Sequence, residues 1–77
     1  MDTKLQMKIS SILHTNAIET EGINNGCIWK LPNRYFKVYD TAGINIYHLQ
    51  AYKYGIDIPY IDVDISLREL IDFMRIQ

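Results

Sequence analysis

The sequence predicts a single α+β domain over residues 1–77, in which a small antiparallel sheet of about three to four strands packs against an N-terminal and a C-terminal helix. Three observations support this prediction: apolar residues at helical spacing near the N-terminus, alternating residues in mid-chain, and a helix-capping signal near the C-terminus. A length of 77 residues allows one domain, and 48% hydrophobic residues are enough for a small core.

The N-terminal helix is predicted over residues 3–14. Its apolar residues recur at i, i+4, i+7 and i+8 and therefore form one stripe, which consists of Leu5, Ile9, Ile12 and Leu13. Asp2 is a good N-cap residue for this helix. We expect the helix to end near the Thr15-Asn16 pair.

Two antiparallel strands are predicted between residues 27 and 39. Alternation places apolar side chains on one face of each strand: Cys27, Trp29 and Leu31 in the first, and Phe36 and Val38 in the second. Asn25-Gly26 indicates a hairpin turn before the first strand, and Pro32-Asn33 indicates a turn between the two. Whether residues 17–21 add a further strand stays open, because their alternation is weak.

Residues 44–54 fit two interpretations. As a strand, they follow a four-residue hairpin connection at 40–43, and their Ile and Tyr residues favour β structure. As a helix, they have Asn45 as N-cap and Gly55 directly after the last turn, with Leu, Gln, Ala and Lys between. The sequence is compatible with both interpretations.

The C-terminal third predicts one strand and one helix. Ile61, Val63 and Ile65 alternate with two aspartates, and Pro59 favours an edge position for this strand. The segment Ser66-Leu67-Arg68-Glu69 is a capping box, and apolar residues recur at i, i+3, i+4 and i+7 after it. The sequence therefore predicts a helix over residues 66–76.

Residues 43–59 contain Gly43, Asn45, Leu49, Tyr52, Gly55 and Pro59 in a spacing that resembles the turn and recognition helix of phage-repressor-type helix-turn-helix domains. The resemblance implies two helices within residues 35–55, with Gln50 and Lys53 reading base edges in the major groove. The ordinary structural interpretation is that the two glycines are turn residues of an α+β domain.

Charge and cysteine usage limit the class of protein. The net charge of −1 argues against nucleic-acid binding by global charge, although the residues up to 53 carry an excess of positive charge and the later ones an excess of negative charge. The single cysteine rules out an intrachain disulfide and favours a reducing compartment, for which we expect the cytoplasm. No apolar run approaches the about 20 residues of a membrane span, so no membrane partner is expected.

Residues capable of catalysis or metal binding are few. Asp62 and Asp64 lie on one side of the predicted strand, where their carboxylates could bind a hard cation. The ordinary interpretation is that they form a solvated face whose negative charge protects a sheet edge from aggregation. Cys27, His14 and His48 have no spacing that brings them together as a thiol-protease set, and the alternation of Cys27 with apolar residues predicts a buried, inert thiol. The sequence therefore predicts no catalytic site, metal or cofactor.

Tyrosine is the most informative residue type for function. Six tyrosines are many for 77 residues, and Tyr, Trp and Arg dominate the binding energy of protein interfaces. Tyr35 and Tyr39 share a strand face with Lys37, beside Arg34, which suits an acidic protein patch or single-stranded nucleic acid. The candidate binding residues are Arg34, Tyr35, Lys37, Tyr39, Tyr47 and Tyr54.

The first hypothesis is a small non-enzymatic protein of a phage or mobile element that docks on a host protein in the cytoplasm and inhibits or modulates it. Its origin is inferred from composition, because the residues with A/T-rich codons (Ile, Asn, Lys and Tyr) make up 29 of 77. The alternative is a small nucleic-acid-binding regulator that uses the helix-turn-helix-like segment at residues 35–55. The oligomeric state stays open, a dimer included.

Overall fold

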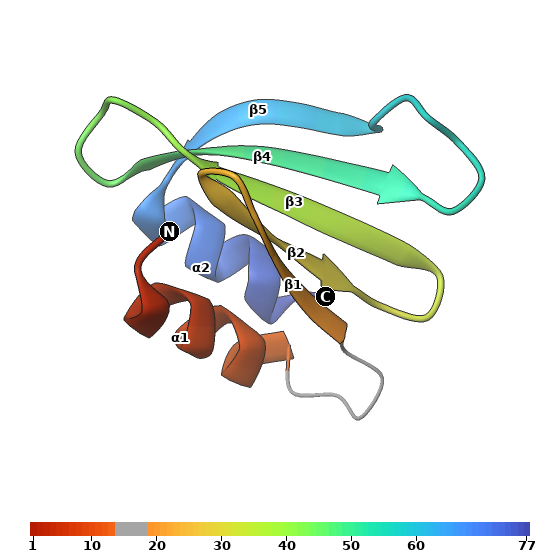
Figure 1. The fold of residues 1–77 in the computed structure, drawn as a ribbon, viewed down its shortest axis with the longest axis horizontal. Coiled ribbons are helices and arrows are strands. Elements are labelled where there is room, and N and C mark those ends of the chain that lie inside the picture. Colours follow the sequence, from red (N-terminus) through yellow and green to blue (C-terminus); the bar gives the residue numbers. More distant parts are fainter. Residues whose placement is uncertain (14–18) are drawn as a thin grey trace.

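The computed structural model describes residues 1–13 and 19–77. In chain order its helices and strands are α1 (Thr3–Leu13), β1 (Glu19–Ile23), β2 (Gly26–Lys30), β3 (Arg34–Asp40), β4 (Ile46–Lys53), β5 (Ile61–Ser66) and α2 (Leu67–Arg75) (Figure 1). The predicted α+β class, with a helix near each end of the chain and an antiparallel sheet between them, is confirmed.

The sheet is an antiparallel meander in which each strand pairs with its neighbours in the chain, in the order β1-β2-β3-β4-β5. Five strands exceed the predicted three to four. The additional strand is β1, which forms one edge of the sheet and is exposed along nearly its whole length. Because neither of its faces is buried, its residues are not required to alternate between apolar and polar types.

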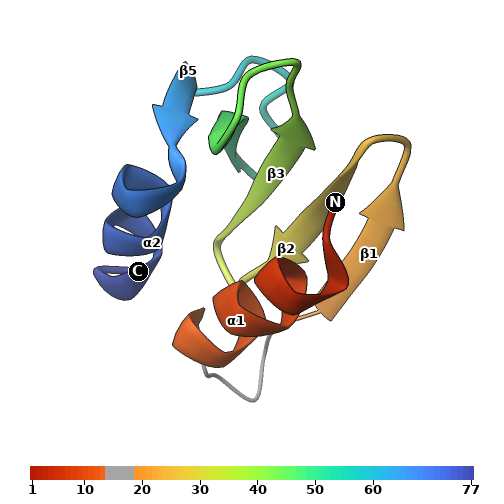
Figure 2. The same cartoon turned by 90° about the vertical axis from the view of Figure 1, so that its left-hand side faces the viewer.

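Both helices cover the same face of the sheet (Figure 2). The core lies between the helices and the sheet, where buried residues of both helices pack against the buried strand residues. The helix residues are Leu5, Ile9 and Leu13 of α1 and Leu70, Ile71 and Met74 of α2. The predicted apolar faces of β2 and β3 are confirmed, because all five of their predicted residues are buried. The indole of Trp29 is fully buried and donates a hydrogen bond to the Ser10 hydroxyl at 2.9 Å, which fixes α1 over β2.

Helix α2 begins at the predicted capping box. The Ser66 hydroxyl accepts a hydrogen bond from the Glu69 amide at 3.2 Å and donates to the Glu69 carboxylate at 2.8 Å. At the N-terminus of α1, the Asp2 carboxylate accepts from the Lys4 amide at 3.0 Å, as expected of an N-cap. Helix α1 extends to Leu13, and the expected end near Thr15-Asn16 lies outside the described residues.

The helix-turn-helix implied by the resemblance within residues 35–55 is not formed, because this segment forms β3 and β4. The two strands pair continuously from Arg34↔Lys53 to Asp40↔Tyr47, and β4 pairs on its other side with β5. Ala51, a strong helix former, is instead fully buried in the sheet. Tertiary packing therefore overrides helix propensity in this segment. The turns on either side of β4 each contain a residue with positive φ, Asn45 at 55° and Gly55 at 82°.

The two predicted turns differ in their outcome. Pro32-Asn33 forms the expected turn, with the Leu31 amide donating to the Arg34 carbonyl at 2.8 Å. The first hairpin turns one residue earlier than expected, at Asn24-Asn25, where Asn25 adopts a φ of 62°. Gly26 belongs to β2, and a Cβ there would lie 2.3 Å from the Val38 carbonyl oxygen, so glycine is required for close strand approach.

Candidate binding surface on the open face of the sheet

The face of the sheet opposite the helices carries no covering element among residues 1–13 and 19–77 (Figure 2). Residues paired across an antiparallel sheet point to the same side, so the strand register assigns side chains to this face. We call it the open face, and its side chains include Glu19, Glu21, Ile28, Lys30, Tyr35, Lys37, Tyr39, His48, Gln50, Tyr52, Asp62 and Asp64. Strand β3 runs through its centre, and β1 and β5 form its edges.

Three tyrosines form a cluster on the open face. The rings of Tyr35 and Tyr52, directly paired across β3 and β4, stack with centroids 4.9 Å apart and planes 3° apart. The Tyr54 ring lies 5.3 Å from that of Tyr35, and its hydroxyl donates to the Leu31 carbonyl at 2.8 Å. The Lys37 ammonium lies 5.0 Å from the Tyr52 ring and 6.0 Å from the Tyr35 ring. The cluster is therefore a packed aromatic surface with the Lys37 ammonium next to two of its rings.

His48 links β4 to the edge strand β5 through two aspartates. Its Nε2 lies 2.6 Å from an oxygen of Asp62, and its Nδ1 lies 2.7 Å from an oxygen of Asp64. Carboxylates only accept hydrogen bonds, so the ring satisfies both when it is protonated on both nitrogens. The hydrogen bond to Asp64 is the main cause of the raised pKa of His48, and that to Asp62 adds to it, while partial burial opposes them.

The charges of the open face are arranged by strand. Lys37 and Lys30 lie on β3 and β2, and Lys30 approaches Glu21 of the edge strand β1 at 3.5 Å. The two aspartates on the opposite edge flank His48, whose ring lies 6.4 Å from that of Tyr39. The face is therefore positive and aromatic along its centre and acidic along both edges.

The predicted binding residues divide between the two faces of the sheet. Tyr35, Lys37 and Tyr39 share the open face as expected, and Tyr54 joins them. Arg34 points to the helix side, where its guanidinium lies 5.8 Å from the Phe36 ring and its Nη2 donates to the Gln77 carbonyl at 3.3 Å. The structure therefore ties Arg34 to the C-terminus and does not bring it to the tyrosines.

Tyr47 also lies on the helix side of the sheet, packed against the core. Burial, and then the nearby carboxylates of Asp40 and Asp2, raise the pKa of its phenol. Asp40 itself binds the N-terminal ammonium of Met1 at 2.8 Å. Tyr47 is thus part of the contact between the N-terminus and the sheet. Its side chain lies on the face of the sheet opposite to that of Lys37.

Sequence reasoning missed His48, Gln50 and Tyr52 as members of the open face. Their i, i+2, i+4 spacing places all three on one side of a strand, and this is the signal by which they are found. The signal depends on residues 44–54 being a strand, and the sequence alone leaves that question open. Gln50 lies between the aspartates and the tyrosines, donating to Asp62 at 3.4 Å and accepting from the Tyr52 hydroxyl at 3.3 Å.

The structure does not bring Cys27 and His48 together, because they lie on opposite faces of the sheet. The Cys27 thiol is fully buried, and burial is the main cause of its raised pKa, so it is a core side chain as predicted. His14 lies outside the described residues. Within residues 1–13 and 19–77, no group of three or more His, Cys, Asp or Glu residues is arranged to hold a metal ion.

Comparison of the chain with models of protein families, with curated proteins and with solved structures finds no match. In the part of the chain that the structure describes, neither helix has the length and apolar character needed to cross a membrane.

Proposed function

We propose that this chain is a non-enzymatic binding protein that docks through the open face on another protein and modulates its activity. The observation that supports the proposal is the aromatic cluster on an uncovered sheet face, with Lys37 held above the stacked rings of Tyr35 and Tyr52. Ordered aromatic side chains give large contact area at low entropic cost, and they concentrate in the centre of protein interfaces.

The charge pattern indicates the chemistry of the partner. A complementary surface presents an acidic group to Lys37 at the centre and basic groups to the carboxylates at the two edges. Burying the central cation opposite a carboxylate contributes specificity, while the edge charges mainly steer association. The partner is thus a protein surface of mixed charge.

The same pattern disfavours nucleic acid as the partner of this face. Glu19, Glu21, Asp62 and Asp64 share the open face with two lysines. Binding to a polyphosphate chain requires a track of positive charge that neutralises several phosphates. The four carboxylates repel the phosphates of such a chain. A nucleic-acid-binding regulator is therefore the alternative function, and the nuclease treatment in the experiment below distinguishes it from docking on a protein.

The phage or mobile-element part of the proposal depends on composition alone. Ile, Asn, Lys and Tyr together account for 29 of the 77 residues. The partner in the proposal is accordingly a protein of the host cell.

The proposal is tested by capture of partners from lysate on the immobilised chain, with and without nuclease. We expect a protein that is retained in both conditions by the wild type and lost with Lys37→Glu. Lys4→Glu is the matched control, because it makes the same charge change at an exposed position of α1 on the other side of the sheet. The activity of the captured protein is then measured with increasing amounts of the chain.

Equal capture by Lys37→Glu and the wild type contradicts docking through the open face. Loss of all retained protein after nuclease treatment favours the regulator instead. A captured protein whose activity is unchanged by saturating amounts of the chain contradicts the modulating role, even where binding is confirmed.

A further inference from the structure

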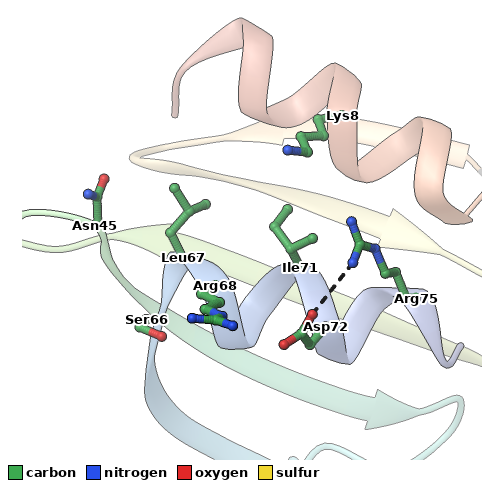
Figure 3. Close-up of a pocket in the computed structure, with 8 residues that line it drawn as sticks. All are labelled: Lys8, Asn45, Ser66, Leu67, Arg68, Ile71, Asp72 and Arg75. Atoms are coloured by element: carbon green, nitrogen blue, oxygen red, sulfur yellow. Dashed lines mark ion pairs between the residues drawn. The ribbon is translucent and has the colours of Figure 1, made fainter.

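A second candidate site lies on the helix side of the sheet, in a groove between α1 and α2 (Figure 3). The groove has a volume of about 550 Å³, within the range of small-molecule sites in proteins. Leu67 and Ile71 point from α2 toward α1 and form its apolar floor. The sheet separates this groove from the open face, so it does not depend on the proposed docking function.

The charged residues that line the groove are mostly cationic. Lys8 of α1 and Arg68 of α2 are exposed, and neither makes an ion pair with any described residue. Arg75 pairs with Asp72, the one carboxylate of the lining, at a distance of 3.7 Å. An excess of positive charge thus surrounds an apolar floor.

We propose that this groove binds a small organic anion with an apolar body. Its apolar part lies on Leu67 and Ile71, where contact removes hydrocarbon surface from water. Its anionic group is held by Lys8 and Arg68 through charge-assisted hydrogen bonds. Asp72 opposes the anion, because it repels the negative charge and occupies Arg75.

The probe is octanoate, added to the full-length chain and followed by two-dimensional NMR. We expect shifts concentrated at Leu67, Ile71, Lys8 and Arg68. Octylammonium has the same apolar body with the opposite charge and is expected to bind at least about fivefold more weakly. Inorganic phosphate, an anion without an apolar body, is expected to bind more weakly still.

Removing a positive charge and removing a negative charge from this groove are expected to change the affinity for octanoate in opposite directions. Lys8→Gln and Arg68→Gln are each expected to weaken octanoate binding about two- to fivefold, as for exposed ion pairs. Asp72→Asn is expected to tighten it by a similar factor of about two to five, because it removes repulsion and releases Arg75. Lys30→Gln is the matched control, since it removes one positive charge from the open face and leaves the groove unchanged.

Three results overturn the proposal. The first is octylammonium binding as tightly as octanoate, and the second is unchanged octanoate affinity in Lys8→Gln, Arg68→Gln and Asp72→Asn. The third is the absence of shifts at the groove with octanoate. Shifts produced there instead by a glutamate-rich peptide or an anionic vesicle would assign the groove to a macromolecule. The NMR spectra report the fold of each variant at the same time, and binding to the open face does not affect any of these outcomes.

Discussion

The rings of Tyr35 and Tyr52 stack in parallel across β3 and β4, with their centroids 4.9 Å apart. Tyr52 is only 8% exposed although it points away from the helices, because Tyr35, Lys37 and Gln50 surround it. The open face therefore has a packed layer of its own side chains.

This stacking predicts an energetic coupling between the two tyrosines. In a double-mutant cycle with Tyr35→Leu and Tyr52→Leu, we expect a coupling of about 0.5–1.5 kcal/mol, measured by urea unfolding. Leucine keeps most of the apolar volume and removes the aromatic pairing. A cycle of Tyr35→Leu with Ile12→Ala, on α1, serves as the control, and equal coupling in both cycles would argue against a specific ring–ring interaction.

Leu70 of α2 is fully buried in the core between the helices and the sheet. Leu70→Ala is expected to destabilise the fold by about 2–5 kcal/mol, because it leaves a cavity that a small domain is unable to fill. Ser66→Ala, which removes only the N-cap of the same helix, is expected to cost about 1 kcal/mol. An unchanged denaturation midpoint for Leu70→Ala would contradict the packing of α2.

Gly26 and Gly22 provide a matched pair of glycines in one hairpin. Gly26→Ala is expected to destabilise the fold, because its Cβ would lie 2.3 Å from the Val38 carbonyl oxygen and force β2 and β3 apart. Gly22→Ala has no atom within 4 Å of its Cβ and is expected to be neutral or to stabilise by up to about 1 kcal/mol. Thermal unfolding compares the two, and equal midpoints would contradict the strand spacing at Gly26.

The contacts of His48 with Asp62 and Asp64 are expected to make a pH-dependent contribution to the stability of the fold. Its pKa in the folded chain is raised above the unfolded value of about 6.5, mainly by the hydrogen bond to Asp64. The contribution is thus fully present below about pH 6.5 and is lost as the pH rises through the raised folded-state pKa. From about pH 6 to about pH 9 we expect the wild type to lose more unfolding free energy than His48→Gln, measured by urea denaturation. Parallel pH profiles of the two proteins would contradict the double contact with the aspartates.

The sequence is sufficient to predict the elements whose signals are local. The capping box at Ser66 locates α2, and the alternation around Trp29 and Phe36 locates β2 and β3, because each of these patterns is contained within a short segment. The strand β4 is undecided from sequence because Gly55 is compatible both with a helix end and with a hairpin turn. Pairing with β3 on one side and β5 on the other decides it, and neither contact is visible in the segment itself.

The candidate surface is partly predictable for the same reason. The period of a strand assigns Tyr35, Lys37 and Tyr39 to one face. Arg34 does not share this face, because adjacent residues of a strand point to opposite faces, and its partner Gln77 lies 43 residues further along the chain. Tyr52 and His48 require knowledge of the register between β3 and β4, which only the folded chain supplies.

The most direct test of docking through the open face is the dissociation constant of the captured partner for four variants, measured beside their thermal midpoints. Tyr39→Ala and Lys37→Ala are expected to weaken binding by about 2 kcal/mol, roughly thirtyfold, with unchanged folds. Asp62→Asn and Asp64→Asn, at the edge of the same face, are expected to change it less, because edge charges mainly affect the association rate. Normal binding of the Tyr39 and Lys37 variants, together with loss of binding by the aspartate variants, would contradict the account and move the interface to β5.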